Sequence, residues 1–188
     1  MDGGRRILFA FLARWPAASE PRCWMKTVLS FSIAAICGVA ACGCRKSPLQ
    51  SSSMAPTITN GEKVIVDYTA YLLSKPKRWE VAVFDGPTPI SSTNPAAKRV
   101  IALPLETISF NSNGIVVNGR SLGTPPALSN FVYYPPEKWP DQGSLITFPY
   151  TVPAKQYFVL GDNMANSLDS RYYGAVSETN LLGRVKKK

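Results

Sequence analysis

Hydrophobic residues form one long uninterrupted run near the start of the chain. Residues 27–44 (TVLSFSIAAICGVAACGC) contain no charged side chain, and a run of this length is at the short end for a membrane-spanning helix. Five Lys and Arg side chains precede the run, whereas only Arg45 and Lys46 follow it closely. By the positive-inside rule this asymmetry places the N-terminus in the cytoplasm and the rest of the chain outside. We therefore predict a basic cytoplasmic segment over residues 1–26, an anchor over 27–44 and a folded domain over 45–188.

The same run contains a competing signal. The sequence VAAC at residues 39–42 is similar to the lipobox of bacterial lipoproteins, and the apolar run after Met25 is typical of a lipoprotein signal that begins there. In that case Cys42 would carry lipid, and the residues before it would be removed. Both alternatives tether the domain to a membrane. The sequence leaves open whether the helix is retained or Cys42 is lipidated, and whether translation starts at Met1 or Met25.

Beyond residue 45 the pattern changes to short segments rich in Val, Ile, Phe and Tyr that are separated by turns, which is typical of β-strands. The expected strands are KVIVDY (63–68), EVAVF (80–84), KRVIAL (98–103), TISFN (107–111), GIVVNG (114–119), QYFVL (156–160) and LLGRV (181–185). Asn113-Gly114 favours a hairpin turn between two of them. Residues 121–153 are rich in Pro and aromatic side chains, which predicts a loop or a small extension. The pattern therefore predicts an all-β domain.

The composition narrows the chemistry of this domain. The chain has no His, which excludes Ser-His-Asp and Cys-His mechanisms, HExxH sites and most catalytic zinc sites. All four Cys precede residue 45, so the predicted domain has no disulfide of its own. The net charge is +9, but the basic residues are scattered and no aromatic-basic motif accompanies them. This distribution argues against nucleic-acid binding and favours attraction to anionic lipid.

A serine nucleophile in this chain needs a base other than His. Lysine is the usual substitute, but at its reference pKa of about 10.4 only roughly one side chain in a few thousand is neutral at pH 7. Burial among apolar side chains can lower that pKa to about 7–8. A useful lysine should therefore lie on a strand with apolar neighbours. Lys98, which follows two Ala and begins the segment KRVIAL, fits this environment best.

Four segments behind the apolar run resemble the motifs of a known family. The boxes of type I signal peptidases are matched, in order, by SSSMAPT (51–57), WEVAVF (79–84), KRVIALP (98–104) and GDNMANSLDSRYYG (161–174). Members of that family are membrane-bound serine proteases that remove signal peptides from exported preproteins. The resemblance spans residues 49–185. It implies an all-β, mainly antiparallel fold with a coiled, barrel-like catalytic core.

The resemblance also implies roles for the serines and for one lysine. Ser53 corresponds to the nucleophile and Lys98 to the general base. Ser51 would stabilise the oxyanion together with the backbone N–H of Ser53. Ser167 corresponds to a serine that hydrogen-bonds and orients the lysine, and Ser52 occupies a variable position.

Further residues are implied as support for the site. Two structural pairs are expected, Asp162 with Arg99 and Asp169 with Arg171. The candidates for the substrate pocket are Leu49, Ile58 and Ala97. The resemblance implies no cofactor and no metal, and it implies preprotein signal peptides and membrane lipid as partners.

Several residues depart from the family's pattern. Ala97 is smaller than the Ile or Val expected beside the base, which would widen the wall of the substrate pocket. Leu105 stands where Gly is common and would accommodate a positive φ, so a changed turn is expected. Gln50 replaces a common Pro, and Met164 replaces a common Arg. None of these changes removes a catalytic group, but together they leave open which substrates the protein prefers.

We therefore predict a membrane-bound serine endopeptidase that cleaves preproteins at A-x-A-like sites. It would span the bacterial cytoplasmic membrane once, with the catalytic domain on the outer, periplasmic side. Ser53 lies nine residues after Cys44, which corresponds to at most about 30 Å of extended chain, so the site should lie near the membrane. Two alternatives remain: a self-cleaving Ser-Lys peptidase similar to the SOS-repressor group, and an inactive tethered β domain that binds exported peptides.

Overall fold

The computed structural model describes residues 43–48, 50–85, 95–129, 131–139 and 144–186. The predicted anchor up to Cys42 lies outside these residues, as does Leu49. In the part of the chain that is described, no helix is both long and apolar enough to cross a bilayer.

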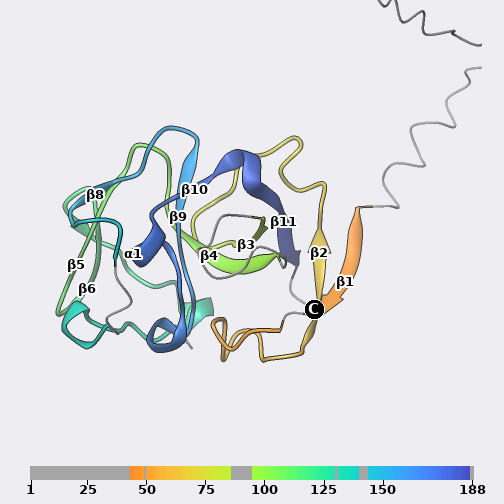
Figure 1. Cartoon of the computed structure of the whole chain (residues 1–188), viewed down its shortest axis with the longest axis horizontal. Coiled ribbons are helices and arrows are strands. Elements are labelled where there is room, and N and C mark those ends of the chain that lie inside the picture. The colour runs from red at the N-terminus through yellow and green to blue at the C-terminus, as the bar shows by residue number, and fades with distance from the viewer. Residues whose placement is uncertain (1–42, 49, 86–94, 130, 140–143, 187–188) are drawn as a thin grey trace, which may run out of the picture.

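Among the described residues the strands form two antiparallel sheets (Figure 1). The larger sheet has the order β1 (Cys44–Pro48), β2 (Lys63–Asp67), β11 (Leu181–Lys186), β3 (Val81–Phe84), β4 (Ala96–Ala102), β9 (Gln156–Leu160) and β10 (Val176–Ser177). The smaller sheet has the order β7 (Arg120–Ser121), β6 (Gly114–Val117), β5 (Thr107–Asn111) and β8 (Tyr150–Thr151). The helical elements described are α1 (Ser170–Tyr173) and the 3-10 turns Pro126–Leu128, Pro136–Lys138, Met164–Asn166 and Glu178–Asn180.

The prediction of an all-β, mainly antiparallel domain is confirmed. All seven predicted strands are present, with bounds within two residues of those expected. The sequence pattern did not predict β1, β7, β8 and β10. β1 (CRKSP) lacks an apolar alternation and begins at Cys44, the last residue of the predicted anchor, while the other three strands have only two residues each.

The larger sheet curls, so that β2 and β9 stand on either side of β3 and β4 in Figure 1. Register shifts occur where β11 pairs with β3 and where β4 pairs with β9. Such bulges bend a strand and increase its twist. Gly183 lies at the first shift, and a Cβ atom there would approach the backbone oxygen of Asp67 to 2.6 Å, so the bend requires glycine.

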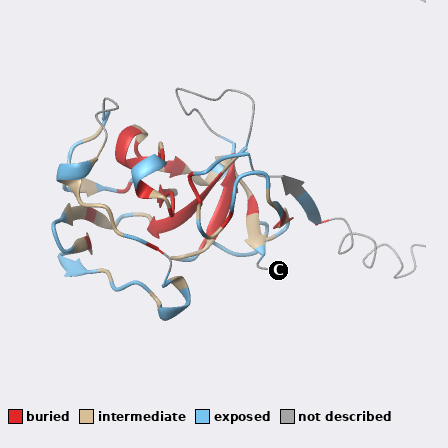
Figure 2. Cartoon of the chain, turned by 90° about the horizontal axis from the view of Figure 1, so that it is seen from below, coloured by how far each residue is buried: buried red, intermediate tan, exposed pale blue. Residues whose placement is uncertain are grey.

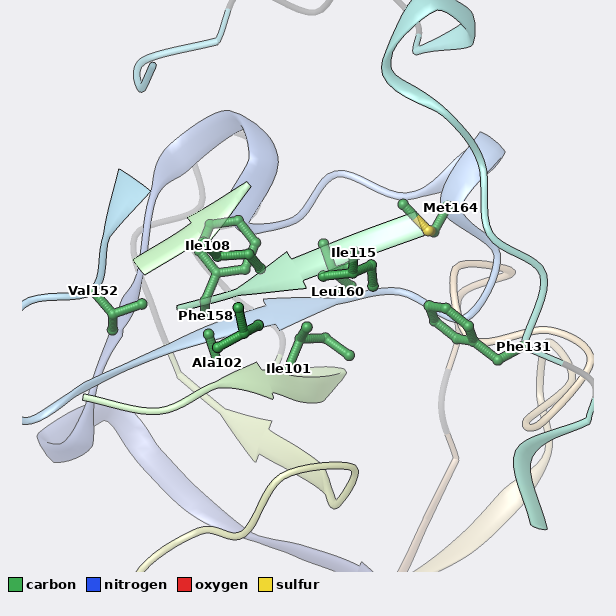
Figure 3. Close-up of a cluster of buried hydrophobic side chains, with 10 residues drawn as sticks. Ile101, Ala102, Ile108, Ile115, Phe131, Val152, Phe158, Leu160 and Met164 are labelled. Atoms are coloured by element: carbon green, nitrogen blue, oxygen red, sulfur yellow. The ribbon is translucent and has the colours of Figure 1, made fainter. Parts of the chain in front are cut away.

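Two clusters of buried side chains hold the strands that carry the candidate site. The first lies between the sheets (Figure 3), and its members are Ile101, Ala102, Ile108, Ile115, Val117, Phe131, Val152, Phe158, Leu160 and Met164. The second lies under the loop that follows β1, and its members are Met54, Ile58, Val64, Val66, Val81, Val83 and Ala97. Both clusters draw on β4, which is among the most buried parts of the chain (Figure 2). Burial of these side chains stabilises the folded state by about 25 cal/mol for each Å² of apolar surface removed from water.

The turns agree with the sequence in one case and differ in another. The predicted hairpin of β5 and β6 forms, and the Asn111 side chain caps it by accepting hydrogen bonds from the N–H groups of Asn113 and Gly114.

The expectation that the turn at Leu105 would change is wrong for the backbone conformation of that residue. Leu105 has a φ of 68°, so the backbone keeps the left-handed conformation that Gly would favour. A non-glycine residue in this region carries roughly 1–2 kcal/mol of strain.

Aromatic side chains from the described part of residues 121–153 pack against the smaller sheet. Phe110 of β5 meets Trp139 and Phe148 edge-on, with ring centroids 4.9 and 5.0 Å away. Trp139 also lies over the guanidinium of Arg171, 5.0 Å from the ring centroid. The extension therefore reaches from the smaller sheet to the segment after β9, where several candidate site residues are found.

Candidate active site

Ser53 and Lys98 lie in direct contact although 45 residues separate them in the sequence. The Nζ atom of Lys98 is 2.5 Å from the Oγ atom of Ser53, and both side chains are buried. Lys98 lies on β4 opposite Ala82 of β3, with β9 on the other side. Ser53 lies in the loop between β1 and β2. A buried strand thus supplies the amine, and a loop packed on the second apolar cluster supplies the hydroxyl.

The environment of Lys98 favours the neutral amine. The pKa of Lys98 is lowered from 10.5 to about 8, mainly by burial; Asp169 and Asp162 act to raise this pKa, and the charge of Arg171 acts to lower it. Burial is the largest of these effects because the ammonium form loses its hydration. At pH 7 roughly one Lys98 in ten is then neutral, compared with one in a few thousand for a solvated lysine. A neutral Lys98 can accept the proton of Ser53 through the contact already formed.

Ser51 lies in contact with Ser53, and its hydroxyl is already engaged in hydrogen bonds. It donates a hydrogen bond to Ser53 Oγ at 3.0 Å and accepts one from the backbone N–H of Ser53 at 3.2 Å. The two groups expected to hold an oxyanion are therefore bonded to each other. Ser51 is exposed, so its side chain can rotate to free both groups for another acceptor.

The two expected ion pairs are both present and buried. Arg99, next to Lys98 on β4, donates from Nε and Nη2 to the two carboxylate oxygens of Asp162, at 2.6 and 2.5 Å. Arg171 donates from Nε to Asp169 Oδ1 at 2.8 Å. Arg171 also donates to the carbonyl oxygens of Met164 and Ser167, at 2.7 and 3.2 Å. These bonds fix the shape of residues 161–171 beside the site.

Ser167 differs from its expected role. Its Oγ atom is buried, and it has no hydrogen-bond partner among the described residues, so the expected bond to Lys98 is not formed. It nevertheless lies against the site, because a Cβ atom added to Gly161 would come within 2.2 Å of Ser167 Oγ and 2.6 Å of the carbonyl oxygen of Ser53. Gly161 therefore permits the close approach of Ser167 and the loop that carries Ser53.

Hydrogen bonds that were not predicted from the sequence join residues 161–167 to the serine loop. The backbone N–H of Asn163 donates to the Ser53 carbonyl at 3.0 Å, and its side-chain amide donates to the Ser52 carbonyl at 3.3 Å. The amide of Asn166 donates to Ser52 Oγ at 2.9 Å. The sequence assigned Ser52 no role. An Asn after a Gly turn is typical of a side chain that hydrogen-bonds to nearby backbone groups. Here the partners of Asn163 and Asn166 lie in the serine loop, more than 100 residues away in the sequence, and only the fold brings them close.

Two of the three candidate pocket residues, Ile58 and Ala97, lie in the described part of the chain. Ile58 and Ala97 lie in one buried cluster with Met54. Met54 follows Ser53 in the chain, and Ala97 precedes Lys98. Leu49 lies outside the described residues. The role of Ile58 and Ala97 in a substrate pocket stays a prediction.

Comparisons with known proteins agree with these motifs. The family model described as signal peptidase, peptidase S26, matches residues 22–188. Signal peptidase I of Leptolyngbya laminosa is 31% identical over 182 residues, which cover 90% of this chain and 83% of that protein. The probable signal peptidase I-2 of Synechocystis sp. is 34% identical over 163 residues, which cover 85% and 69% of the two chains. A crystal structure of a signal peptidase I from Enterococcus faecalis V583 is 32% identical, covers 60% of this chain and 98% of that one, and superposes with a TM-score of 0.47.

Replacing Gly161 with Ala should strongly reduce peptidase activity without unfolding the protein. The new methyl group would overlap the carbonyl oxygen of Ser53, which belongs to the backbone and cannot rotate away. A displacement of the nucleophile by about 1 Å costs on the order of 100-fold in rate, so we expect kcat to fall by at least that factor. Gly123→Ala is the matched control, because a Cβ atom there meets nothing within 4 Å. Wild-type kcat in Gly161→Ala would show that the loop accommodates the methyl group.

Proposed function

The chain belongs to the S26 family of signal peptidases, and from that premise we propose that Ser53 and Lys98 are the catalytic dyad with which it cleaves preproteins. As a member of this family the protein is a serine peptidase that removes signal peptides. The single observation that supports the dyad is the 2.5 Å contact between Lys98 Nζ and Ser53 Oγ in a buried site.

The proposed reaction has two steps. Ser53 Oγ attacks the scissile carbonyl carbon while Lys98 takes its proton, and the C–N bond then breaks as Lys98 returns that proton to the leaving amine. The signal peptide is left as an ester on Ser53. Water attacks this ester, Lys98 accepts the proton of the water, and the C–O bond to Ser53 breaks as Oγ is reprotonated.

Ser51 and the backbone of Ser53 are the proposed oxyanion donors in both steps. Once the Ser51 hydroxyl turns away from Ser53, its O–H and the freed Ser53 N–H can both donate to the carbonyl oxygen on which negative charge develops. Removal of one oxyanion donor typically lowers kcat by a factor of about 10²–10³. Ser167, Asp162, Arg99, Asp169 and Arg171 are proposed as positioning residues around the dyad.

The membrane arrangement is a further part of the proposal. The apolar run before Gly43 anchors the chain in the bacterial cytoplasmic membrane, the catalytic domain lies on the outer side, and membrane lipid and signal peptides are its partners. The charge asymmetry around the apolar run supports this orientation. The Gly43 carbonyl accepts a hydrogen bond from the Tyr68 N–H at 2.7 Å, so the chain enters the domain at the outer edge of the larger sheet. Arg45 and Lys46, the next basic side chains, are exposed there and available to anionic lipid.

Removing either member of the dyad should abolish cleavage. With the full chain in membranes and a preprotein that carries an A-x-A site, we expect Ser53→Ala and Lys98→Ala each to lower kcat by about 10⁴-fold or more. Lys63→Ala is the matched control, because Lys63 is an exposed lysine at the start of β2. Cleavage that survives in Lys98→Ala would rule out the proposed base. Inactivity of the wild type on several preproteins would instead favour the alternative of a binding domain, and self-cleavage alone would favour the repressor-like alternative.

The rate should depend on pH through the lysine. Because the pKa of Lys98 lies at about 8 and only the neutral amine is a base, kcat should rise about tenfold per pH unit below pH 8. Above that value it should level off. The measurement is kcat at saturating preprotein between pH 6 and pH 10 in membranes of constant composition. A flat profile between pH 6 and pH 9 would mean that the base is another group.

The anchor can be tested by the state of the mature N-terminus. If the helix is retained, N-terminal sequencing of the membrane-extracted protein will begin at Met1 or Met25, and Cys42 will carry no acyl mass. Cys42→Ser should then leave membrane attachment unchanged. A protein that begins at Cys42 with added acyl mass would establish the lipoprotein alternative and exclude the retained helix.

A further inference from the structure

A second cavity lies beside the serine loop and outside the contact between Ser53 and Lys98. Its volume is about 320 Å³, and its lining residues are Ala55, Pro56, Val132, Tyr134, Asp162, Asn163, Met164 and Ala165. We refer to it as the Pro56 pocket. Neither reactive side chain lines it, and neither do the candidate pocket residues Ile58 and Ala97.

The Pro56 pocket is close enough to the reaction centre to hold part of a bound substrate. Ala55 is two residues after Ser53, so their Cα atoms are at most about 7.6 Å apart. Asn163, from the opposite wall, bonds the carbonyl of Ser53 through its own backbone N–H at 3.0 Å. An extended peptide advances about 3.3 Å per residue. A substrate whose scissile carbonyl lies at Ser53 can therefore reach the pocket within two or three residues.

The lining of the pocket favours an uncharged apolar side chain. It is built mainly from methyl groups, a proline ring and a tyrosine ring, and Val132 remains 67% exposed beside it. The one carboxylate in the lining, Asp162, is already paired with Arg99. A backbone bridge between Val132 and Asn163 joins the two walls, so the pocket is formed before substrate arrives. In Figure 3 Met164 lies beside Phe131, and Val132 is the residue that follows Phe131 in the chain.

The serine loop separates the Pro56 pocket from the cavity that holds the candidate residue Ile58. Thr57 and Ile58 line a cavity of about 670 Å³ together with Val81 and Arg99. Ala55 and Pro56, the two residues before them, line the Pro56 pocket instead. A substrate whose signal-peptide half occupies the cavity of Ile58 would therefore place its mature half toward the Pro56 pocket.

We propose that the Pro56 pocket binds an apolar side chain from the first three residues of the mature protein, on the carboxyl side of the cleaved bond. This inference rests on the proposed function of the dyad. It adds a determinant of specificity outside the signal peptide: preproteins with an apolar residue in this region are processed faster.

The test uses the full chain in membranes and preproteins that share one signal peptide. The first, second and third mature positions are changed in turn to Leu, Gly or Asp. We expect Leu at one of these positions to raise kcat/KM about tenfold over Gly, as one apolar side chain in a fitting pocket does. Ala165→Phe fills the pocket and should reduce this Leu-to-Gly ratio to about one. Ala154→Phe is the matched control, an exposed alanine away from the dyad, and should keep the ratio.

Two results would overturn the inference. One is a Leu-to-Gly ratio near one at all three positions in the wild type. The other is a change in selectivity for the signal-peptide residues, rather than the mature ones, in Ala165→Phe. Affinity measured with the Ser53→Ala protein and uncleaved preproteins separates this inference from the proposed chemistry. Tighter binding of the Leu preprotein, lost in the double variant with Ala165→Phe, supports the pocket even if no cleavage is seen, and equal binding rejects it.

Discussion

The site depends on keeping one amine out of water. Lys98 is held on β4 between β3 and β9, under a loop that is itself packed on an apolar cluster. Lowering its pKa from 10.5 to about 8 corresponds to roughly 3 kcal/mol of unfavourable free energy for the ammonium form. The rest of the fold offsets that amount through burial of β4, in which every residue after Ala96 is buried, and this explains why the base lies on one of the most buried strands of the domain.

The buried ion pairs follow from the same constraint. Asp162 and Asp169 both act to raise the pKa of Lys98, so without partners of opposite charge they would favour the ammonium form. Each carboxylate is instead matched by a guanidinium, Arg99 or Arg171, within 3 Å. The pairs therefore serve the base by neutralising the charges that shape the loop around it. Trp139 lies over the guanidinium of Arg171 and also packs against Phe110 of the smaller sheet. The smaller sheet therefore helps to hold this ion pair in place.

The sequence predicted the parts of the structure that local pattern controls. The seven longer strands follow from short β-branched and aromatic segments, and Lys98 follows from its apolar flanks once His is absent. The edge strand β1 and the two-residue strands carry no such pattern and depend on pairing. The bonds of Asn163 and Asn166 to Ser52 and Ser53 join residues more than 100 positions apart. The Pro56 pocket is lined by three segments that are distant in the sequence, residues 55–56, 132–134 and 162–165. Contacts of this kind depend on the assembled fold, which residue spacing does not encode.

The hydrogen bonds of the serine loop connect binding to activation in the proposed mechanism. Without substrate, the Ser51 hydroxyl and the Ser53 N–H satisfy each other, and Ser51 also donates to Ser53 Oγ. A carbonyl oxygen that enters the site competes for both donors. When Ser51 turns toward it, Ser53 Oγ loses a hydrogen bond that stabilises its lone pair and keeps only its contact with Lys98. The nucleophile thus becomes more reactive as the oxyanion donors become available. Asn163 holds the Ser53 carbonyl fixed during this change, so the rearrangement is confined to one exposed side chain.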